Sequence, residues 1–371
     1  MIEAVRKGDL FESSAQTLVN TVNTVGVMGK GIALEFKRRF PEMFADYQRR
    51  CEAGQVRLGE PYLWRGLIDP WVINFPTKDH WRSVSRVADV ERGLAYLAEH
   101  VGEWGVTSLA VPPLGAGSGG LDWATVGPTI FRHLDQLPIP VVLYAPFDAP
   151  DEQATVEFLA ARAPRPETVP NARLEPGWIA LAEVVRQVSE TPHAWPVGRT
   201  RLQKLAYFAT VGGIPTGLNF LEASYGPFAE DLARALTRLV NNGVLTETRT
   251  GRMLAVRPGP TFADARTRYG ATLAPHEQAI RRVADLLARL DSAETELAAS
   301  VHFATGALRQ QLHRAPTELE VLKKVQLWKQ RRTPPLAEQD IVAAIRDLAA
   351  LGWIAVTPST DLPPDEAASV A

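Results

Sequence analysis

The chain has 371 residues, of which 46% are hydrophobic and 22% charged, with 40 basic residues, 42 acidic residues and one cysteine. This length predicts two or three domains of roughly 100–200 residues each, and the single cysteine excludes a disulfide framework and a cysteine-ligated zinc site. The nearly balanced charge does not by itself indicate a nucleic-acid partner. No apolar stretch approaches the ~18–20 residues that a membrane span needs, and the first residues are charged where a signal peptide is apolar. We therefore expect a cytoplasmic protein without membrane contact, metal or cofactor.

The first 158 residues alternate between short strand-like runs and amphipathic helices. Apolar or β-branched runs predict strands at Ile2–Arg6, Thr17–Val22, Tyr62–Trp64, Trp71–Phe75, Ser108–Val111 and Val141–Tyr144. Apolar spacing predicts helices at Ile32–Arg39, Glu42–Cys51, Ser85–Val101 and Trp123–Leu137. Alternation of this kind is typical of a three-layer α/β/α domain with a parallel or mixed sheet.

The pattern changes between residues 148 and 176, where five prolines and clustered polar residues interrupt it. We expect an α/β domain at 1–158, a linker at 159–175, a mainly α-helical domain at 176–357 and a disordered tail at 358–371. Helices are expected at Gly177–Val188, Arg199–Ala209, Pro227–Asn241, Pro275–Asp291, Glu294–Thr305, Pro316–Lys329 and Glu338–Leu351. Short strands at Leu245–Arg249 with Met253–Arg257, and at Ile354–Val356, predict a winged-helix-like element.

A glycine-rich turn follows the predicted strand Thr17–Val22 and leads directly into a helix. It reads GVMGKGIA from Gly26 to Ala33. Glycines allow backbone N–H groups to approach an anion closely, and the helix N-terminus adds its dipole. The turn is not a Walker A loop, because a glycine and not Ser or Thr follows Lys30. Taken alone, it is also compatible with a turn that binds nothing.

A second glycine loop, PPLGAGSGG at residues 112–120, follows the predicted strand Ser108–Val111. Its stretch from Gly115 to Gly120 is literally G-x-G-x-x-G, so a dinucleotide-binding fold has to be considered. That pattern requires an acid about 20 residues further on, whereas Asp148 lies further away. Two glycine loops at strand ends of one α/β domain indicate instead a ligand whose diphosphate lies between them.

Four polar residues lie close to the predicted strand ends. Asp9 offers an acceptor for an exocyclic amine, and the amides of Asn20 and Asn23 either orient a ribose or serve as turn residues. Lys78 follows the strand Trp71–Phe75, at the same edge of the sheet. A loop lysine is most often solvated, but one beside a diphosphate ligand is suited to act as a nucleophile or electrostatic stabiliser.

Together, Gly8-Asp9-Leu10, Val19-Asn20 with Asn23, GVMGKGIALEFK and PPLGAGSGGLDW resemble the macrodomain, the ADP-ribose-binding α/β/α fold, over about residues 1–158. The first loop and the Lys78 segment resemble the branch that comprises TARG-type hydrolases and the DarG antitoxins of DarT–DarG toxin–antitoxin pairs. The resemblance implies that Asp9 contacts the adenine amine, that both loops surround the diphosphate, and that Lys78 is catalytic at the anomeric carbon of the distal ribose. The residues it implies for ADP-ribose binding are Asp9, Leu10, Asn20, Asn23, Gly26, Met28, Gly29, Gly31, Ile32, Thr77, Pro113, Leu114, Gly115, Ala116, Gly117, Ser118, Gly119 and Phe147.

One position departs from the TARG-type pattern. Those enzymes pair the lysine with an aspartate in the second loop, where this sequence has Gly119, and Asp122 follows three residues later. The departure favours the DarG comparison, in which the lysine is the principal catalytic group. The implied reaction hydrolyses the N-glycosidic bond between ADP-ribose and thymidine in single-stranded DNA. Its oxocarbenium-like transition state needs a nucleophile or a stabilised water at the ribose carbon.

The second half resembles the helical domain of SocA-like proteins and of DarG antitoxins. The residues that carry this resemblance are Gln203-Lys204-Leu205, Tyr207-Phe208 and Tyr225-Gly226-Pro227-Phe228. Aromatic residues at helical spacing are typical of a core. The resemblance implies that residues 176–357 bind and inhibit a DarT-like toxin. The basic run from Lys323 to Arg332 is typical of a solvated helix face, with a contact to DNA or to an acidic partner as the alternative.

Three other functions remain open on the sequence alone. The α/β domain could be a non-catalytic ADP-ribose reader fused to an interaction module, or a hydrolase that acts on ADP-ribosylated protein. The second half could be a winged-helix DNA binder or an autoregulator, for which salt-dependent affinity for DNA would be diagnostic.

Overall fold

The structure is a computed structural model that describes residues 1–163, 174–192, 195–250 and 253–362. The chain divides into two compact units that separate in the sequence at residues 173 and 174, with residues 236–242 grouped with the first. The predicted linker at 159–175 falls largely on residues 164–173 and the predicted tail partly on 363–371, so these parts of the predictions lie outside the described residues. No helix in the described part of the chain is long and apolar enough to cross a lipid bilayer.

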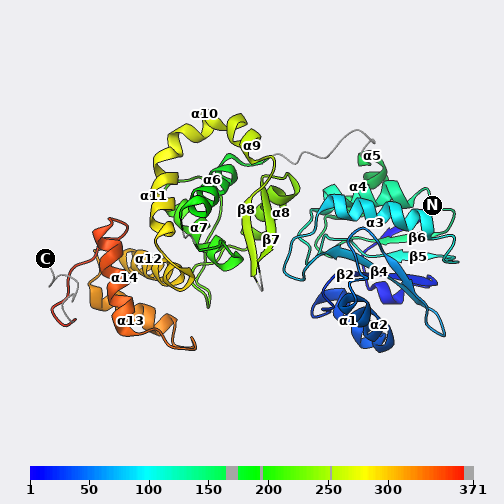
Figure 1. The fold of residues 1–371 in the computed structure, drawn as a ribbon, viewed down its shortest axis with the longest axis horizontal. Helices are drawn as coiled ribbons and strands as arrows, with labels where there is room; N and C mark the ends of the chain where they lie inside the picture. Colours follow the sequence, from blue (N-terminus) through cyan, green and yellow to red (C-terminus); the bar gives the residue numbers. More distant parts are fainter. Residues whose placement is uncertain (164–173, 193–194, 251–252, 363–371) are drawn as a thin grey trace. The chain divides into compact units, whose positions relative to one another are not determined.

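The first unit is built on a six-stranded sheet with the strand order β1-β6-β5-β2-β4-β3. Its strands are β1 (Ile2–Arg6), β2 (Thr17–Asn23), β3 (Tyr62–Trp64), β4 (Trp71–Lys78), β5 (Leu109–Val111) and β6 (Val141–Tyr144). Four of these strands, β2, β4, β5 and β6, are labelled in Figure 1. Only β3 runs antiparallel to its neighbour, β4, and the other pairs are parallel. The predicted mixed sheet is therefore confirmed, and the C-terminal ends of the five parallel strands meet at one edge.

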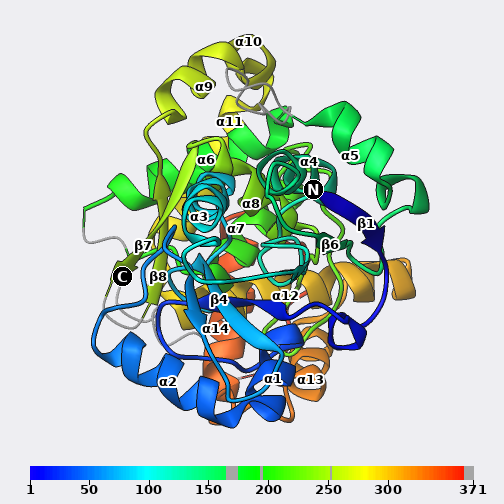
Figure 2. The ribbon, with the colours of Figure 1, turned by 90° about the vertical axis from the view of Figure 1, so that its right-hand side faces the viewer.

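Helices cover both faces of this sheet (Figure 2). On one face, α1 (Gly31–Arg39) and α2 (Pro41–Glu52) bury apolar side chains against the strands, and α3 (Val87–His100) and α4 (Trp123–Leu134) do so on the other. The predicted three-layer α/β/α fold is thus confirmed. A further helix, α5 (Val156–Arg162), continues past the predicted domain end at residue 158, because Leu159 is fully buried in the core that α4 lines.

The second unit is mainly helical, as predicted. Its helices are α6 (Pro176–Glu190), α7 (Arg199–Val211), α9 (Phe262–Arg268), α10 (Gly270–Leu273), α11 (Glu277–Ala288), α12 (Ser292–Leu312), α13 (Glu318–Trp328) and α14 (Glu338–Ala350). The helix α8 (Leu232–Asn241) begins in this unit, and its residues from 236 on are grouped with the first. The predicted hairpin is present as β7 (Leu245–Thr250) and β8 (Met253–Pro258). The predicted strand at Ile354–Val356 is wrong, since Thr357 makes a single parallel bridge to Thr317 instead. The sequence did not predict α9 and α10, because these helices are too short to show a clear helical period.

Residues 221–228, here called the hairpin segment, replace the first turn of the helix predicted from Pro227. Leu221 and Phe228 exchange two backbone hydrogen bonds of 2.9 Å, and α8 begins only at Leu232. The prediction that the aromatic residues of this half form the core is right for Tyr207 and Phe208, which are buried. It is wrong in the hairpin segment, where 70% of Tyr225 and 46% of Phe228 are exposed.

Three side chains hold the hairpin segment by its carbonyl groups. Trp328 Nε1 donates to the carbonyl of Ala223 (3.1 Å), Lys329 Nζ to that of Ser224 (2.9 Å) and Lys204 Nζ to that of Pro227 (2.9 Å). Lys329 also pairs with Glu296 at 2.8 Å and is buried. The predicted solvated face of the basic run is therefore wrong at Lys329, whose charge is satisfied inside the unit.

Candidate functional site

Lys78 connects the two glycine loops. It is the last residue of β4 and lies beside Asn23 of β2 in the strand register. Its carbonyl accepts a hydrogen bond from the N–H of Thr24 (3.1 Å), and its ammonium group donates to the carbonyl of Ser118. The whole segment between β2 and α1, residues 24–30, is here called the first glycine loop. Because the first contact lies at the start of this loop and the second within the other, Lys78 is held between them, with only 9% of its surface exposed.

The first glycine loop, residues 24–30, is shaped by the amide of Asn23. Its oxygen accepts from the N–H groups of Val25 (3.0 Å) and Val27 (3.3 Å), and its nitrogen donates to the carbonyl of Val27 (2.6 Å). The hydroxyl of Tyr47 donates to the carbonyl of Asn23 (2.7 Å). Burial raises the pKa of Tyr47, so this phenol stays protonated and remains a donor. The hydrogen bonds of the Asn23 amide thus hold the conformation of the loop that leads to α1.

The N-terminus of α1 is open. The helix begins at Gly31, and Lys30 before it makes no side-chain capping hydrogen bond. Gly29, Lys30 and Gly31 are exposed. Because the first N–H groups of a helix have no acceptor within the helix, they are available to an anion, and the helix dipole favours negative charge at this position.

The second glycine loop is braced by its own backbone. Ala116 N–H donates to the carbonyl of Pro113, Gly120 N–H to that of Gly117 and Leu121 N–H to that of Gly115, each at 3.0 Å. Gly115 adopts φ +73°, a conformation that other L-residues rarely adopt. These three hydrogen bonds and the positive φ of Gly115 define the shape of the loop.

Gly119 lies at the position where the resemblance to TARG-type enzymes implies an aspartate. A Cβ atom there would lie 2.2 Å from the carbonyl oxygen of Gly115 and 2.3 Å from Ser85 Oγ. In addition, the N–H of Ser85 donates to the Gly119 carbonyl at 3.0 Å. The loop in this form cannot hold an aspartate at this point. Asp122 does not replace it, because its carboxylate caps α4 by accepting from the N–H of Ala124 at 3.1 Å.

Asp9 lies beyond the C-terminal end of β1 and caps the short 3-10 helix Leu10–Glu12. One carboxylate oxygen accepts from the N–H of Phe11 (3.0 Å), and the other lies 3.7 Å from a guanidinium nitrogen of Arg39. About half of the side chain is exposed, 48%. The carboxylate is thus oriented by protein contacts and also accessible to a ligand amine.

Asn20 is fully buried within the sheet, where its amide nitrogen donates to Asn74 Oδ1 of the neighbouring strand at 2.9 Å. Asn74 in turn donates to the hydroxyl of Tyr62 at 3.2 Å. The amide oxygen of Asn20 has no hydrogen-bond partner among the described residues. Asn20 therefore takes part in a polar chain across β2, β4 and β3, below the surface that carries the loops.

The other predicted binding residues divide by exposure. Leu10, Met28, Thr77, Leu114 and Gly115 are buried, and Phe147 is 80% exposed on the loop after β6. Gly26, Ile32, Pro113 and Ala116 are half-buried, and Gly117 and Ser118 are exposed. Sequence reasoning missed three supporting residues: Asn74, Arg39 and Ser85. Only strand pairing and loop proximity bring them to Asn20, Asp9 and Gly119, so no local signal marks them.

The first unit is a macrodomain. Residues 19–130 match the Macro domain family, and both glycine loops and Lys78 lie within that range. This match confirms the predicted fold class for the first unit.

The whole chain resembles known enzymes. It is 36% identical to the DNA ADP-ribosyl glycohydrolase of Thermus aquaticus, over all of this chain and 99% of that protein. It is 37% identical to the enzyme of the same name from Mycobacterium tuberculosis, over 80% of this chain and 86% of that one. A "DNA ADP-ribosyl transferase-DNA ADP-ribosyl glycohydrolase fusion protein" of Thermosipho africanus is 40% identical over 41% of this chain and 45% of its own length. The chain belongs to the DNA ADP-ribosyl glycohydrolase family, so the predicted enzyme class is confirmed.

Proposed function

We propose that the macrodomain hydrolyses the bond between ADP-ribose and thymidine in single-stranded DNA, and that Lys78 is its catalytic residue. The observation that carries this proposal is the position of Lys78, which both glycine loops contact through hydrogen bonds. If the loops hold the diphosphate, the ammonium group lies within reach of the distal ribose. The names of the curated relatives support DNA as the carrier of the modification.

In the proposed reaction, water adds across the N-glycosidic bond, so that ADP-ribose gains the hydroxyl group and the base nitrogen gains the proton. Lys78 can serve in two ways. As a neutral amine it attacks the ribose carbon and is later replaced by water, whereas as an ammonium group it stabilises the departing base. Mass spectrometry of a rapidly quenched reaction separates the two, because only the first forms a covalent adduct of ADP-ribose on Lys78.

The Lys78→Ala variant tests the proposal. The parent protein should release ADP-ribose from a modified single-stranded oligonucleotide, and the variant should lose at least a hundredfold in rate while still binding free ADP-ribose. Lys37→Ala, which removes an exposed lysine of α1, serves as the charge-matched control and should keep full activity. Release from modified protein but not from DNA would assign the protein-directed hydrolase, and binding without release by the parent would assign a reader.

We also propose that the second unit binds and inhibits a DNA ADP-ribosyltransferase toxin. The fusion of a transferase with a glycohydrolase in the Thermosipho africanus relative supports such a pairing. The hairpin segment is a suitable contact surface, because its backbone is anchored while Leu221 and Tyr225 are 74% and 70% exposed. The chain would then act as an antitoxin twice: by removing the modification and by blocking the enzyme that adds it.

A further inference from the structure

The segment that follows Lys78 carries an exposed stack of planar side chains. The rings of His80 and Trp81 are stacked, with centroids 5.5 Å apart and planes at 29°. The guanidinium carbon of Arg82 lies 4.4 Å from the centroid of the Trp81 ring. Trp81 is 44% exposed and belongs to neither apolar core of the first unit. A core role therefore does not explain this tryptophan.

Hydrogen bonds hold residues 79–83 in place. The N–H of Arg82 donates to His80 Nδ1 (3.2 Å), and the N–H of Ser83 to the carbonyl of His80 (2.9 Å). Thr24 Oγ1, in the first glycine loop, donates to the carbonyl of Asp79 (2.7 Å). The stack is thus tied to the same loop that contacts Lys78.

The stack lies within a few nucleotides of the reaction centre. Trp81 is three residues after Lys78, so their Cα atoms are at most about 11 Å apart. That distance is the length of about three stacked nucleotides at ~3.4 Å each. A base within about three nucleotides of the modified thymidine can therefore reach the stack while the ADP-ribose lies between the glycine loops.

The chemistry of the stack suits single-stranded nucleic acid. Aromatic rings stack on bases of any sequence, and an arginine adds a planar cation that also attracts phosphate. Arg82 and Arg86 are exposed here, against one exposed carboxylate, that of Asp79. The buried carboxylate of Asp89 interacts electrostatically with Arg86, so Arg82 is the arginine whose charge is directed at a ligand on the stack.

We infer that His80, Trp81 and Arg82 form a base-stacking platform that binds a nucleotide flanking the ADP-ribosylated thymidine. This inference rests on the proposed function, because it requires a substrate in which the modified base is part of a DNA strand. The platform makes the enzyme prefer a strand over an isolated modified nucleotide, and it tolerates any flanking sequence.

The test compares two substrates with the full-length chain: a single-stranded oligonucleotide with one ADP-ribosylated thymidine, and ADP-ribosylated thymidine monophosphate. Trp81→Ala should lower kcat/KM about 5- to 150-fold on the oligonucleotide, the range that stacking of one base supplies. It should leave the mononucleotide rate unchanged, and Trp81→Phe should recover most of the loss. Trp195→Ala removes another exposed tryptophan, 57% exposed in the second unit, and should change neither rate.

A flanking abasic nucleotide identifies the stacked base. When the abasic nucleotide replaces the base that stacks on Trp81, kcat/KM of the parent protein should fall as much as it does in Trp81→Ala. The same substrate should lower kcat/KM of the Trp81→Ala variant no further. Arg82→Ala should reduce the slope of log affinity against log salt by about one.

The outcomes distinguish a failure of the base-stacking platform from a failure of the proposed function. Equal losses on oligonucleotide and mononucleotide, or no loss on either, overturn the platform and leave the proposed function intact. No release by the parent from either substrate overturns the proposed function, and the platform with it.

Discussion

At the scale of single residues, the second glycine loop contains a matched pair of positions. A Cβ atom at Gly119 would collide with the Gly115 carbonyl, whereas a Cβ atom at Gly117 would meet nothing within 4 Å. Gly119→Ala should therefore open the loop and break its hydrogen bond to Ser85. We expect a loss of about 1–3 kcal/mol in the free energy of unfolding and at least tenfold weaker ADP-ribose binding.

Gly117→Ala should leave the free energy of unfolding nearly unchanged, because a Cβ atom there has open space, whereas Gly119→Ala should lower the free energy of unfolding and weaken ADP-ribose binding. Chemical denaturation and calorimetric titration with ADP-ribose measure both quantities. Equal effects of the two substitutions would contradict the close approach of Gly119 to Gly115, and with it the explanation for the missing aspartate.

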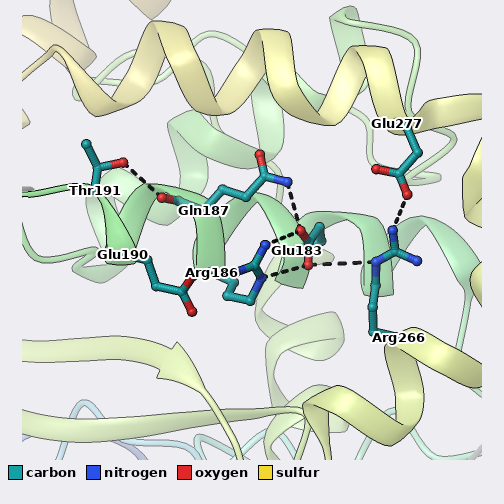
Figure 3. A network of polar contacts seen from close by, with 7 residues as sticks. All are labelled: Glu183, Arg186, Gln187, Glu190, Thr191, Arg266 and Glu277. Carbon is teal, nitrogen blue, oxygen red and sulfur yellow. Dashed lines mark hydrogen bonds and ion pairs between the residues drawn. The ribbon is translucent and has the colours of Figure 1, made fainter.

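At the scale of elements, a buried carboxylate connects three helices of the second unit (Figure 3). Glu183 of α6 accepts from Arg186 (2.7 and 3.0 Å) and Gln187 (2.7 Å) of its own helix, and lies 3.7 Å from Arg266 of α9. Arg266 also pairs with Glu277 of α11. Burial alone would raise the pKa of Glu183, but the hydrogen bonds and positive charges of its partners outweigh burial and lower this pKa.

This lowered pKa predicts a dependence of stability on pH. Because the unfolded chain binds the proton more tightly, the contribution of Glu183 is complete above the ordinary value of 4.5 and is lost as the pH falls through the lowered pKa. Glu183→Gln should cost about 1–3 kcal/mol at neutral pH and should flatten the decline of stability in acid.

Glu190→Gln is the control for this prediction. Glu190 also pairs with Arg186, but its side chain is 60% exposed, and exposed ion pairs contribute little. Urea denaturation of the three proteins from pH 7 to pH 3 gives the comparison. A parallel decline in the parent and in Glu183→Gln would refute the assigned role of Glu183.

At the scale of the whole molecule, the two proposed activities should be separable. Lys78→Ala should still inhibit the cognate transferase but fail to remove existing modification. Tyr225→Asp should still remove existing modification but inhibit the transferase at least tenfold more weakly. The substitution places a charge on the exposed surface of the hairpin segment, while the contacts that anchor its carbonyl groups remain.

Leu351→Asp, at an apolar position of the same unit that is 47% exposed, is the control and should retain both activities. The assays are DNA modification by the transferase and release of ADP-ribose from modified DNA. Full inhibition by Tyr225→Asp would place the toxin contact elsewhere in the second unit.

The sequence by itself determined the features that depend on neighbouring residues. The alternation of strands and helices, the two glycine loops and the lysine after a strand are local patterns, because strand and helix periodicity and the conformational freedom of glycine act within a few residues. The order of these elements was enough to indicate a macrodomain and the residues expected to bind ADP-ribose.

Tertiary structure alone decided what depends on residues far apart in the chain. Asn20 meets Asn74, 54 residues away, only because β2 pairs with β4 in one register. Gly119 must lack a side chain only because Ser85 and Gly115 pack against it. Tyr225 and Phe228 have the spacing of a helix but lie in the hairpin segment, because buried lysines from α7 and from the end of α13 hold its carbonyl groups. Such contacts follow from packing, and periodicity along the chain does not encode them.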